Sequence, residues 1–156
     1  MNESSLDCRR ILKQIGSAKP NAMARIFGRQ EFSQVFGKVE FYDLGIVVAV
    51  VCCMKNLPAT KTNIFAFHIH EYGVCEGDLA SAGAHFGTGE HPNHLGDMPV
   101  LFSNGGEAFL VFCTDRFTIS EIVGRSVIIH ADPDDFVSQP AGNAGERIAC
   151  GLVLKN

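Results

Sequence analysis

The chain has 156 residues, 46% of them hydrophobic, and a formal net charge of -4. This length suits one domain with a complete core and is too short for two domains of ordinary size. With this negative net charge, the sequence shows no basic patch that would bind nucleic acid. The longest apolar stretch, residues 44–54, is well short of the roughly 20 residues that cross a bilayer. We therefore expect neither a nucleic-acid partner nor a membrane span.

The N-terminal segment is the only part of the sequence with a helical pattern. Apolar residues lie near helical spacing in residues 4–15, which predicts a short helix, either docked or frayed. We assign residues 1–21 to an N-terminal extension and residues 22–156 to a β-barrel domain.

Two features of the sequence indicate different compartments. The extension lacks the apolar core and cleavage site of a signal peptide, which favours the cytoplasm. Six cysteines are many for a cytosolic chain of this size, so the compartment stays open.

Short runs rich in β-branched and aromatic residues follow along the rest of the chain. Residues 35–42 and 46–54 flank a turn-like Asp43-Leu44-Gly45 and predict an antiparallel hairpin. Within the second strand, alternation places Cys52 and Cys53 on opposite faces. The other strands are expected at residues 24–27, 64–70, 100–102, 107–113, 125–130 and 147–154. About eight short strands predict an all-β fold, an antiparallel Greek-key sandwich or flattened barrel.

Two long segments, residues 71–99 and 131–145, lack strand character, and loops of this length in a small domain are usually functional. They hold or adjoin nearly every histidine of the chain. Five of the six histidines lie between Phe67 and Met98. The potential ligands, with one aspartate, are His68, His70, His85, His91, His94, His130 and Asp97.

The spacing of these residues favours metal binding. His68 and His70 are two apart on an expected strand, so both side chains can face one ion. An isolated His-x-His pair is about as often one core histidine and one exposed histidine as it is a pair of metal ligands. Here five further ligand candidates favour a metal site. Imidazole-rich tetragonal sites suit copper, and three imidazoles with one carboxylate suit zinc.

Seven ligands cannot fill two separate four-coordinate sites, but they suffice if one imidazole uses both ring nitrogens as a bridge. His85 is the natural bridge because it lies between the strand pair and the group formed by His91, His94 and Asp97. His130, at the end of another expected strand, would then complete the copper-like site.

These residues resemble the copper,zinc superoxide dismutase family over residues 24–154. Phe67-His68-Ile69-His70-Glu71 is similar to the family's copper-binding strand, and the segment around His85 to that of its bridging histidine. The last copper ligand is matched by His130, and residues 142–151 are similar to the C-terminal signature.

The resemblance implies copper at His68, His70, His85 and His130, and zinc at His85, His91, His94 and Asp97. It implies superoxide as the substrate, which copper would convert to dioxygen and hydrogen peroxide by cycling between two oxidation states. In the family the bridging histidine, here His85, also carries a proton to the peroxide product.

Further roles follow from the same resemblance. Arg147 takes the position of the arginine that guides the anionic substrate, and it is the second catalytic residue beside His85. Asp134 resembles the carboxylate that hydrogen-bonds one ligand of each metal. Cys75, spaced from His70 as in bacterial members, would form a disulfide with Cys150. We expect a homodimer, with a copper chaperone as a further candidate partner.

Three departures distinguish the chain from familiar members, one of which is Phe65 and Ala66 in place of polar or glycine residues before the copper strand. The zinc loop is short, and the segment between His130 and Arg147 lacks the charged cluster that steers superoxide in many of them. The alternative is a non-catalytic copper- and zinc-binding module of the same fold, for metal storage or delivery. A cupin-type enzyme also uses a His-x-His pair, but its other ligands are spaced differently.

Overall fold

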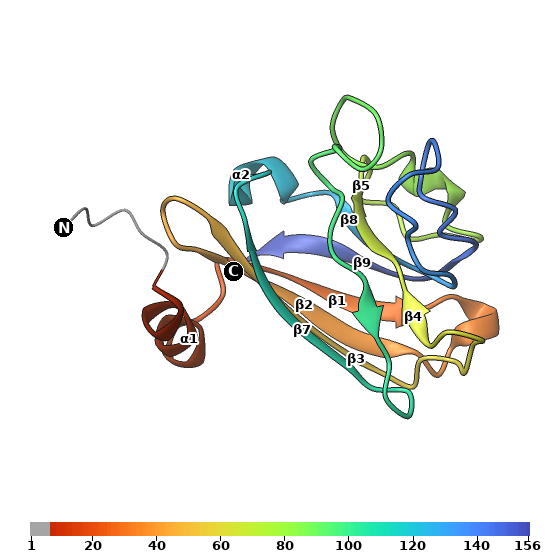
Figure 1. Cartoon of the computed structure of the whole chain (residues 1–156), viewed down its shortest axis with the longest axis horizontal. Coiled ribbons are helices and arrows are strands. Elements are labelled where there is room, and N and C mark those ends of the chain that lie inside the picture. Colours follow the sequence, from red (N-terminus) through yellow and green to blue (C-terminus); the bar gives the residue numbers. More distant parts are fainter. Residues whose placement is uncertain (1–6) are drawn as a thin grey trace.

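The computed structural model describes residues 7–156, which form a curled seven-stranded antiparallel sheet, a two-stranded sheet and two short α-helices (Figure 1). The strands of the large sheet lie in the order β5-β8-β9-β1-β2-β3-β7, and β4 pairs with β6. The expected antiparallel all-β fold is confirmed. The strands are β1 (Ala22–Gly28), β2 (Phe36–Asp43), β3 (Val48–Lys55), β4 (Ile64–Phe65), β5 (Phe67–His70), β6 (Leu101–Phe102), β7 (Ala108–Thr114), β8 (Ser126–His130) and β9 (Arg147–Lys155).

The β2–β3 hairpin forms as its sequence predicts, with boundaries one or two residues later. Asp43 pairs with Val48, and the Leu44 amide donates to the Val47 carbonyl at 3.0 Å to close the turn. Gly45 adopts a φ of +89°, a left-handed conformation that glycine enters without steric cost. The hairpin lies toward one edge of the sheet, between β1 and the edge strand β7.

The core lies on the concave side of this sheet, where alternate residues of each strand point inward. Phe41, Phe67 and Ile129 are completely buried there. Cys52 is buried in the same core, whereas Cys53 is half-buried on the outer face. The prediction that these two cysteines occupy opposite faces is thus confirmed.

The prediction of one strand over residues 64–70 is wrong. Ala66 separates β4 from β5, and the two halves join different sheets. The Ala66 carbonyl accepts from the His130 amide at 2.8 Å, and its own amide donates to the Asp132 carbonyl at 2.9 Å. Because the backbone of Ala66 pairs with the end of β8 while β4 pairs with β6, the chain changes partners at this buried residue.

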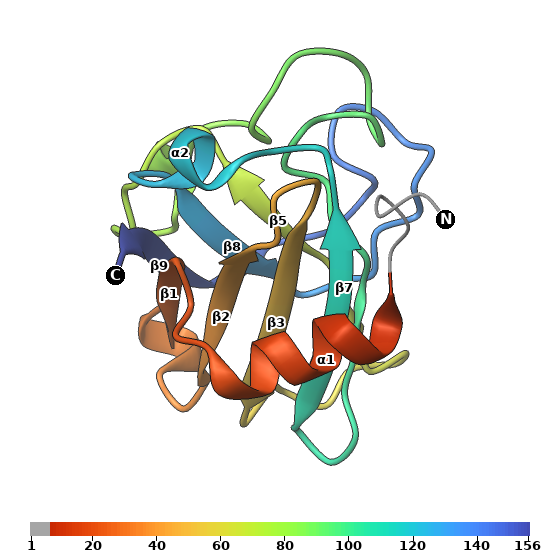
Figure 2. The same cartoon turned by 90° about the vertical axis from the view of Figure 1, so that its left-hand side faces the viewer.

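The N-terminal extension contains α1 (Cys8–Ser17), which lies across the outer face of β2, β3 and β7 (Figure 2). Asp7 caps the helix, and its carboxylate accepts from the Arg9 amide at 3.0 Å. Ile15 packs on an outer cluster of Tyr42, Ala49 and Val51. The helix is therefore docked, although residues 4–6 of the expected helix lie outside the described residues.

Two loop regions complete the architecture. The connections from β5 to β6 and from β8 to β9 gather beside β5 and β8 (Figure 1). Helix α2 (Ile119–Ile122), which the sequence analysis did not predict, begins with a capping box between Thr118 and Glu121. None of the described helices is long and apolar enough to span a membrane.

Candidate metal centre

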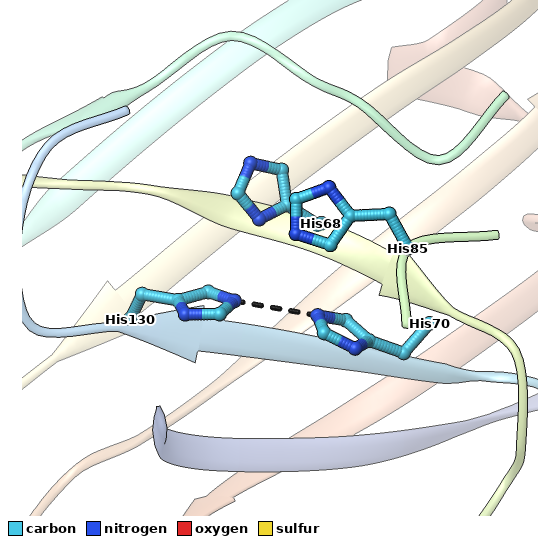
Figure 3. Close-up of side chains that lie close together, drawn as sticks. All are labelled: His68, His70, His85 and His130. Carbon is cyan, nitrogen blue, oxygen red and sulfur yellow. Dashed lines mark hydrogen bonds between the residues drawn. The ribbon is translucent and has the colours of Figure 1, made fainter. Parts of the chain in front are cut away.

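Four histidines form the first cluster, and they come from two strands and one loop (Figure 3). His68 and His70 lie on β5, His130 ends the neighbouring β8, and His85 forms an isolated bridge with His70. One nitrogen from each ring lies within 4.8 Å of the others. The Nε2 atoms of His70 and His130 face each other at 3.3 Å. Nitrogen lone pairs thus converge on one point in the protein interior.

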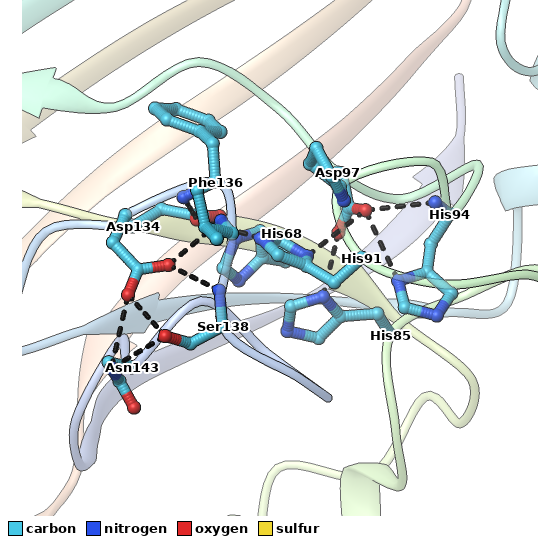
Figure 4. Close-up of polar contacts among 12 residues, drawn as sticks. His68, His85, His91, His94, Asp97, Asp134, Phe136, Ser138 and Asn143 are labelled. Atoms are coloured by element: carbon cyan, nitrogen blue, oxygen red, sulfur yellow. Dashed lines mark hydrogen bonds and ion pairs between the residues drawn. The ribbon is translucent and has the colours of Figure 1, made fainter.

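The second cluster adjoins the first and consists of His85, His91, His94 and Asp97 (Figure 4). Asp97 lies at its centre. One carboxylate oxygen of Asp97 accepts from His85 Nδ1 at 2.7 Å, and the other lies 3.2 Å from Nδ1 of both His91 and His94. Three imidazoles around one carboxylate form a donor set that suits zinc.

His85 belongs to both clusters. Its Nδ1 faces Asp97, while its Nε2 is buried and has no hydrogen-bond partner. His68 Nδ1 and His91 Nδ1 are the other buried imidazole nitrogens without a partner among the described residues. Buried polar atoms are rarely left unpaired, so three orphaned nitrogens in two adjoining clusters fit metal ions as their missing partners. The residues present therefore fit copper and zinc.

Asp134 links the two clusters from outside. Its carboxylate accepts from His68 Nε2 at 2.7 Å and from His91 Nε2 at 2.8 Å. These bonds orient both rings so that their orphaned Nδ1 atoms point away from Asp134, into the clusters. Asp134 thus hydrogen-bonds one candidate ligand from each cluster.

Burial keeps three of the imidazoles neutral, those of His68, His70 and His130. Burial lowers the pKa of His70 to about 2, that of His130 to about 3 and that of His68 to about 4. Burial alone would raise the pKa of Asp97, but hydrogen bonds, led by that from His85, outweigh it and hold the value at about 2. Neutral imidazoles and an ionised carboxylate are the forms that bind metal ions.

Arg147 begins β9 beside the first cluster. Its guanidinium donates to the carbonyls of Leu79 and Gly83, each at 2.7 Å. The same Gly83 carbonyl accepts from His70 Nδ1 at 3.0 Å, so one backbone group connects the arginine with a candidate ligand. The positive charge of Arg147 also contributes to the lowered pKa of His70 and His130, after burial and nearer interactions.

A disulfide joins Cys75 to Cys150, with Cα atoms 5.6 Å apart. It attaches the long loop that follows β5 to the middle of β9. The other cysteines, Cys8, Cys52, Cys53 and Cys113, are free. Since Arg147 holds the same loop a few residues further along, the segment leading to His85 is fixed at two points.

Gly142 has a role at the site that its sequence context did not predict. With a φ of +66°, it approaches the Asp134 bridge so closely that a Cβ there would lie 2.7 Å from His91 Nε2. The Cβ would lie closer still to the Asp134 carboxylate, so only glycine fits this position. The sequence signal for this close approach was the glycine itself, which lies in a loop near candidate ligands.

Two side chains that the sequence did not single out bind the backbone near His91. Arg116 donates to the carbonyls of Pro92 and His94, and Gln139 exchanges two hydrogen bonds with His91. Nothing in the local sequence signals these contacts, because they join segments 22 to 48 residues apart.

The chain is similar to known proteins over most of its length. The family profile described as copper/zinc superoxide dismutase (SODC) matches residues 35–153. Superoxide dismutase (Cu-Zn) 2 of Aquifex aeolicus (strain VF5) is 34% identical over 139 residues, 77% of this chain and 80% of the relative. Superoxide dismutase (Cu-Zn) 1 of the same organism is 34% identical over 135 residues, 75% of this chain and 79% of the relative.

A solved structure supports the same conclusion. A crystal structure of a double mutant of a SOD-like protein from Bacillus subtilis superposes with a TM-score of 0.77 at 27% sequence identity. The match covers 88% of this chain and 99% of the other. Together, the matched profile, the relatives and the two adjoining clusters lead to one conclusion: this chain belongs to the copper/zinc superoxide dismutase family.

Proposed function

We propose that this member of the family dismutates superoxide at the two adjoining clusters, with each metal held by four of the residues described above. Copper is assigned to His68, His70, His85 and His130. Zinc is assigned to His85, His91, His94 and Asp97. The observation that carries this assignment is the shared His85, whose two ring nitrogens face different clusters while its Nε2 lacks any other partner.

The chemistry divides between the metals and the protein. Bound copper supplies the one-electron oxidation and reduction of superoxide, and zinc, which has no redox chemistry, holds its loop and His85. The protein orients the rings through Asp134 and the Gly83 carbonyl. We assign to His85 Nε2 the proton that is delivered to the peroxide product, because Asp97 holds the opposite nitrogen of the same ring.

Arg147 is assigned the binding of the anionic substrate. Its guanidinium is half-buried and fixed by two backbone carbonyls. Burial lowers its pKa and Asp78 raises it, but an arginine stays charged at neutral pH. A fixed positive charge beside the first cluster attracts a small anion in an otherwise acidic protein.

The test combines metal analysis with superoxide turnover on one purified, copper- and zinc-loaded sample. We expect one copper and one zinc per chain, and His130→Ala should lose copper and activity while zinc stays bound. Tight binding of both metals without superoxide consumption would instead support the metal-storage module. The relatives, which are named superoxide dismutases, do not favour that alternative.

We also propose a homodimer formed by the outer faces of β1 and β9. Phe27, Leu152 and Leu154 are 63%, 37% and 57% exposed there and line one surface cavity. Analytical ultracentrifugation should find a dimer, and Phe27→Glu or Leu154→Glu should produce monomers. The control is Phe102→Glu on β6, equally exposed but on another face. A wild-type monomer at micromolar concentrations would contradict the proposal.

A copper chaperone is the second proposed partner. The four histidines assigned to copper are at most 4% exposed, which disfavours capture of a free ion from a pool of low concentration. We expect the zinc-loaded protein to take up tightly buffered Cu(I) slowly, as followed by copper analysis over time. Complete uptake within seconds would make a delivery protein unnecessary.

A further inference from the structure

The backbone between His91 and His94 is held by side chains from other parts of the chain. Among the described residues, no backbone amide donates to the carbonyl of His91 or of Pro92. The His91 carbonyl instead accepts from Gln139 Nε2 at 2.6 Å, and the Pro92 carbonyl from Arg116 at 2.7 Å. The same guanidinium nitrogen donates to the His94 carbonyl at 3.2 Å.

The contact with Gln139 works in both directions. The His91 amide donates to Gln139 Oε1 at 2.9 Å, while the amide group of Gln139 donates back to the His91 carbonyl. A side-chain amide that pairs with the N–H and the C=O of one residue fixes the two peptide groups on either side of that residue. Gln139 belongs to the loop that also carries Asp134, so this loop holds His91 at its ring and at its backbone.

Arg116 reaches the other end of the segment from the connection between β7 and α2. Its own amide donates to Thr114 Oγ1 at 3.1 Å, and the capping box of Thr118 and Glu121 follows directly. The arginine therefore extends from a locally ordered turn. Its guanidinium joins the carbonyls that precede and follow Asn93, and so limits the separation of His91 and His94 along the loop.

We infer that Arg116 and Gln139 are positioning residues that set the affinity and geometry of the zinc cluster by holding the backbone of His91 and His94. This inference rests on the proposed assignment of zinc to His85, His91, His94 and Asp97. A rigid ligand backbone lowers the ordering cost of binding, because fewer conformations are lost when the ion binds.

Four variants and a matched control test the inference in the full-length protein. Arg116→Met removes both donated hydrogen bonds, and Arg116→Lys restores a cationic donor. Gln139→Glu keeps the shape and the acceptor but places a carboxylate oxygen against the His91 carbonyl. Arg10→Met, on the exposed side of α1, is the control because it removes an arginine whose side chain makes no hydrogen bond or ion pair among the described residues. His94→Ala removes a proposed ligand.

The readouts are the zinc dissociation constant, measured by competition with a chromophoric chelator, and the visible spectrum of Co²⁺ bound in place of zinc. We expect Arg116→Met and Gln139→Glu each to weaken zinc binding about tenfold, the effect of one or two lost hydrogen bonds. Both should change the cobalt spectrum, Arg116→Lys should recover part of each effect, and Arg10→Met should match the wild type.

The outcomes separate the inference from the proposed function. Zinc affinity within twofold of wild type and an unaltered cobalt spectrum in Arg116→Met and Gln139→Glu would overturn the inference, even if the melting temperature falls. The zinc assignment itself would still stand if His94→Ala loses zinc in the same assay. Retention of zinc by His94→Ala at wild-type affinity would overturn the assignment and the inference together.

Discussion

At the scale of single residues, Asp134 shows how one side chain can organise two clusters. Burial raises the pKa of its carboxyl, but hydrogen bonds from His68, the Phe136 amide and His91 outweigh this effect and lower it. The carboxylate is therefore ionised and accepts from both rings at once. Partners of this kind orient metal ligands and raise their basicity.

We predict that Asp134→Asn weakens zinc binding by about tenfold to hundredfold, because an amide NH₂ would face one of the two imidazole N–H groups. Chelator competition measures the affinity, and copper binding should fall as well, through His68. Asp132→Asn is the matched control, since Asp132 is exposed two positions earlier. Equal affinities for the two variants would count against the bridging role.

Arg147 gives a second prediction at this scale. Arg147→Gln should lower kcat/KM for superoxide by about tenfold at low ionic strength, because the fixed charge beside the first cluster is lost. Metal content should not change, and Arg147→Lys should recover part of the rate. Pulse radiolysis at several salt concentrations measures the rate of superoxide consumption. If Arg147→Gln has the same rate as the wild type, with the same dependence on salt, Arg147 does not attract the substrate.

At the scale of elements, the disulfide connects a loop to a strand across 75 residues. In the chain-entropy description, closing a loop of this length stabilises the fold by about 4 to 5 kcal/mol, as an upper value. We expect Cys75→Ser with Cys150→Ser to lower the melting temperature by about 10 °C or more. Cys8→Ser, at an exposed free cysteine, should leave it unchanged in the same calorimetric scan.

Helix α1 contributes through the face that it covers. Ile15 and its neighbours shield the outer cluster of Tyr42, Ala49 and Val51. A chain starting at Lys19 keeps the contacts of Pro20 and Asn21 with Asn156. It should retain both metals and its activity, bind a hydrophobic dye and melt several degrees lower. Loss of metal binding would show that the extension belongs to the barrel domain.

At the scale of the whole molecule, the metals and the fold depend on one another. The two clusters join β5, β8 and the long loop between β5 and β6, so metal binding stabilises contacts between distant parts of the chain. Free metal at 1,000 times its dissociation constant contributes about 4 kcal/mol per site.

We therefore predict that chelation of both metals lowers the melting temperature by about 10 °C or more, and that zinc alone recovers part of the loss. Differential scanning calorimetry of the loaded, metal-free and zinc-only forms measures this effect. Magnesium serves as the control, since it prefers oxygen ligands. Identical melting temperatures for the loaded and metal-free forms would contradict the prediction.

Local patterns in the chain were enough to predict most strands and all members of the two clusters. Alternating apolar residues and the Asp43-Leu44-Gly45 turn predicted the β2–β3 hairpin, because side-chain period and turn chemistry are local properties. The candidate ligands could be named because few residue types bind copper or zinc and they are concentrated in one region of the sequence. Their number indicated that one histidine is shared, and the position of His85 between the two groups in the sequence singled it out.

The tertiary structure decided what depends on distant partners. The break at Ala66 arises because β4 and β5 pair with different strands, which no pattern within residues 64–70 reveals. Likewise, Arg116 and Gln139 reach the backbone beside His91 and His94 across gaps of 22 to 48 residues. Spacing along a chain predicts which residues share a strand face, but only the folded backbone determines which side chain meets which carbonyl.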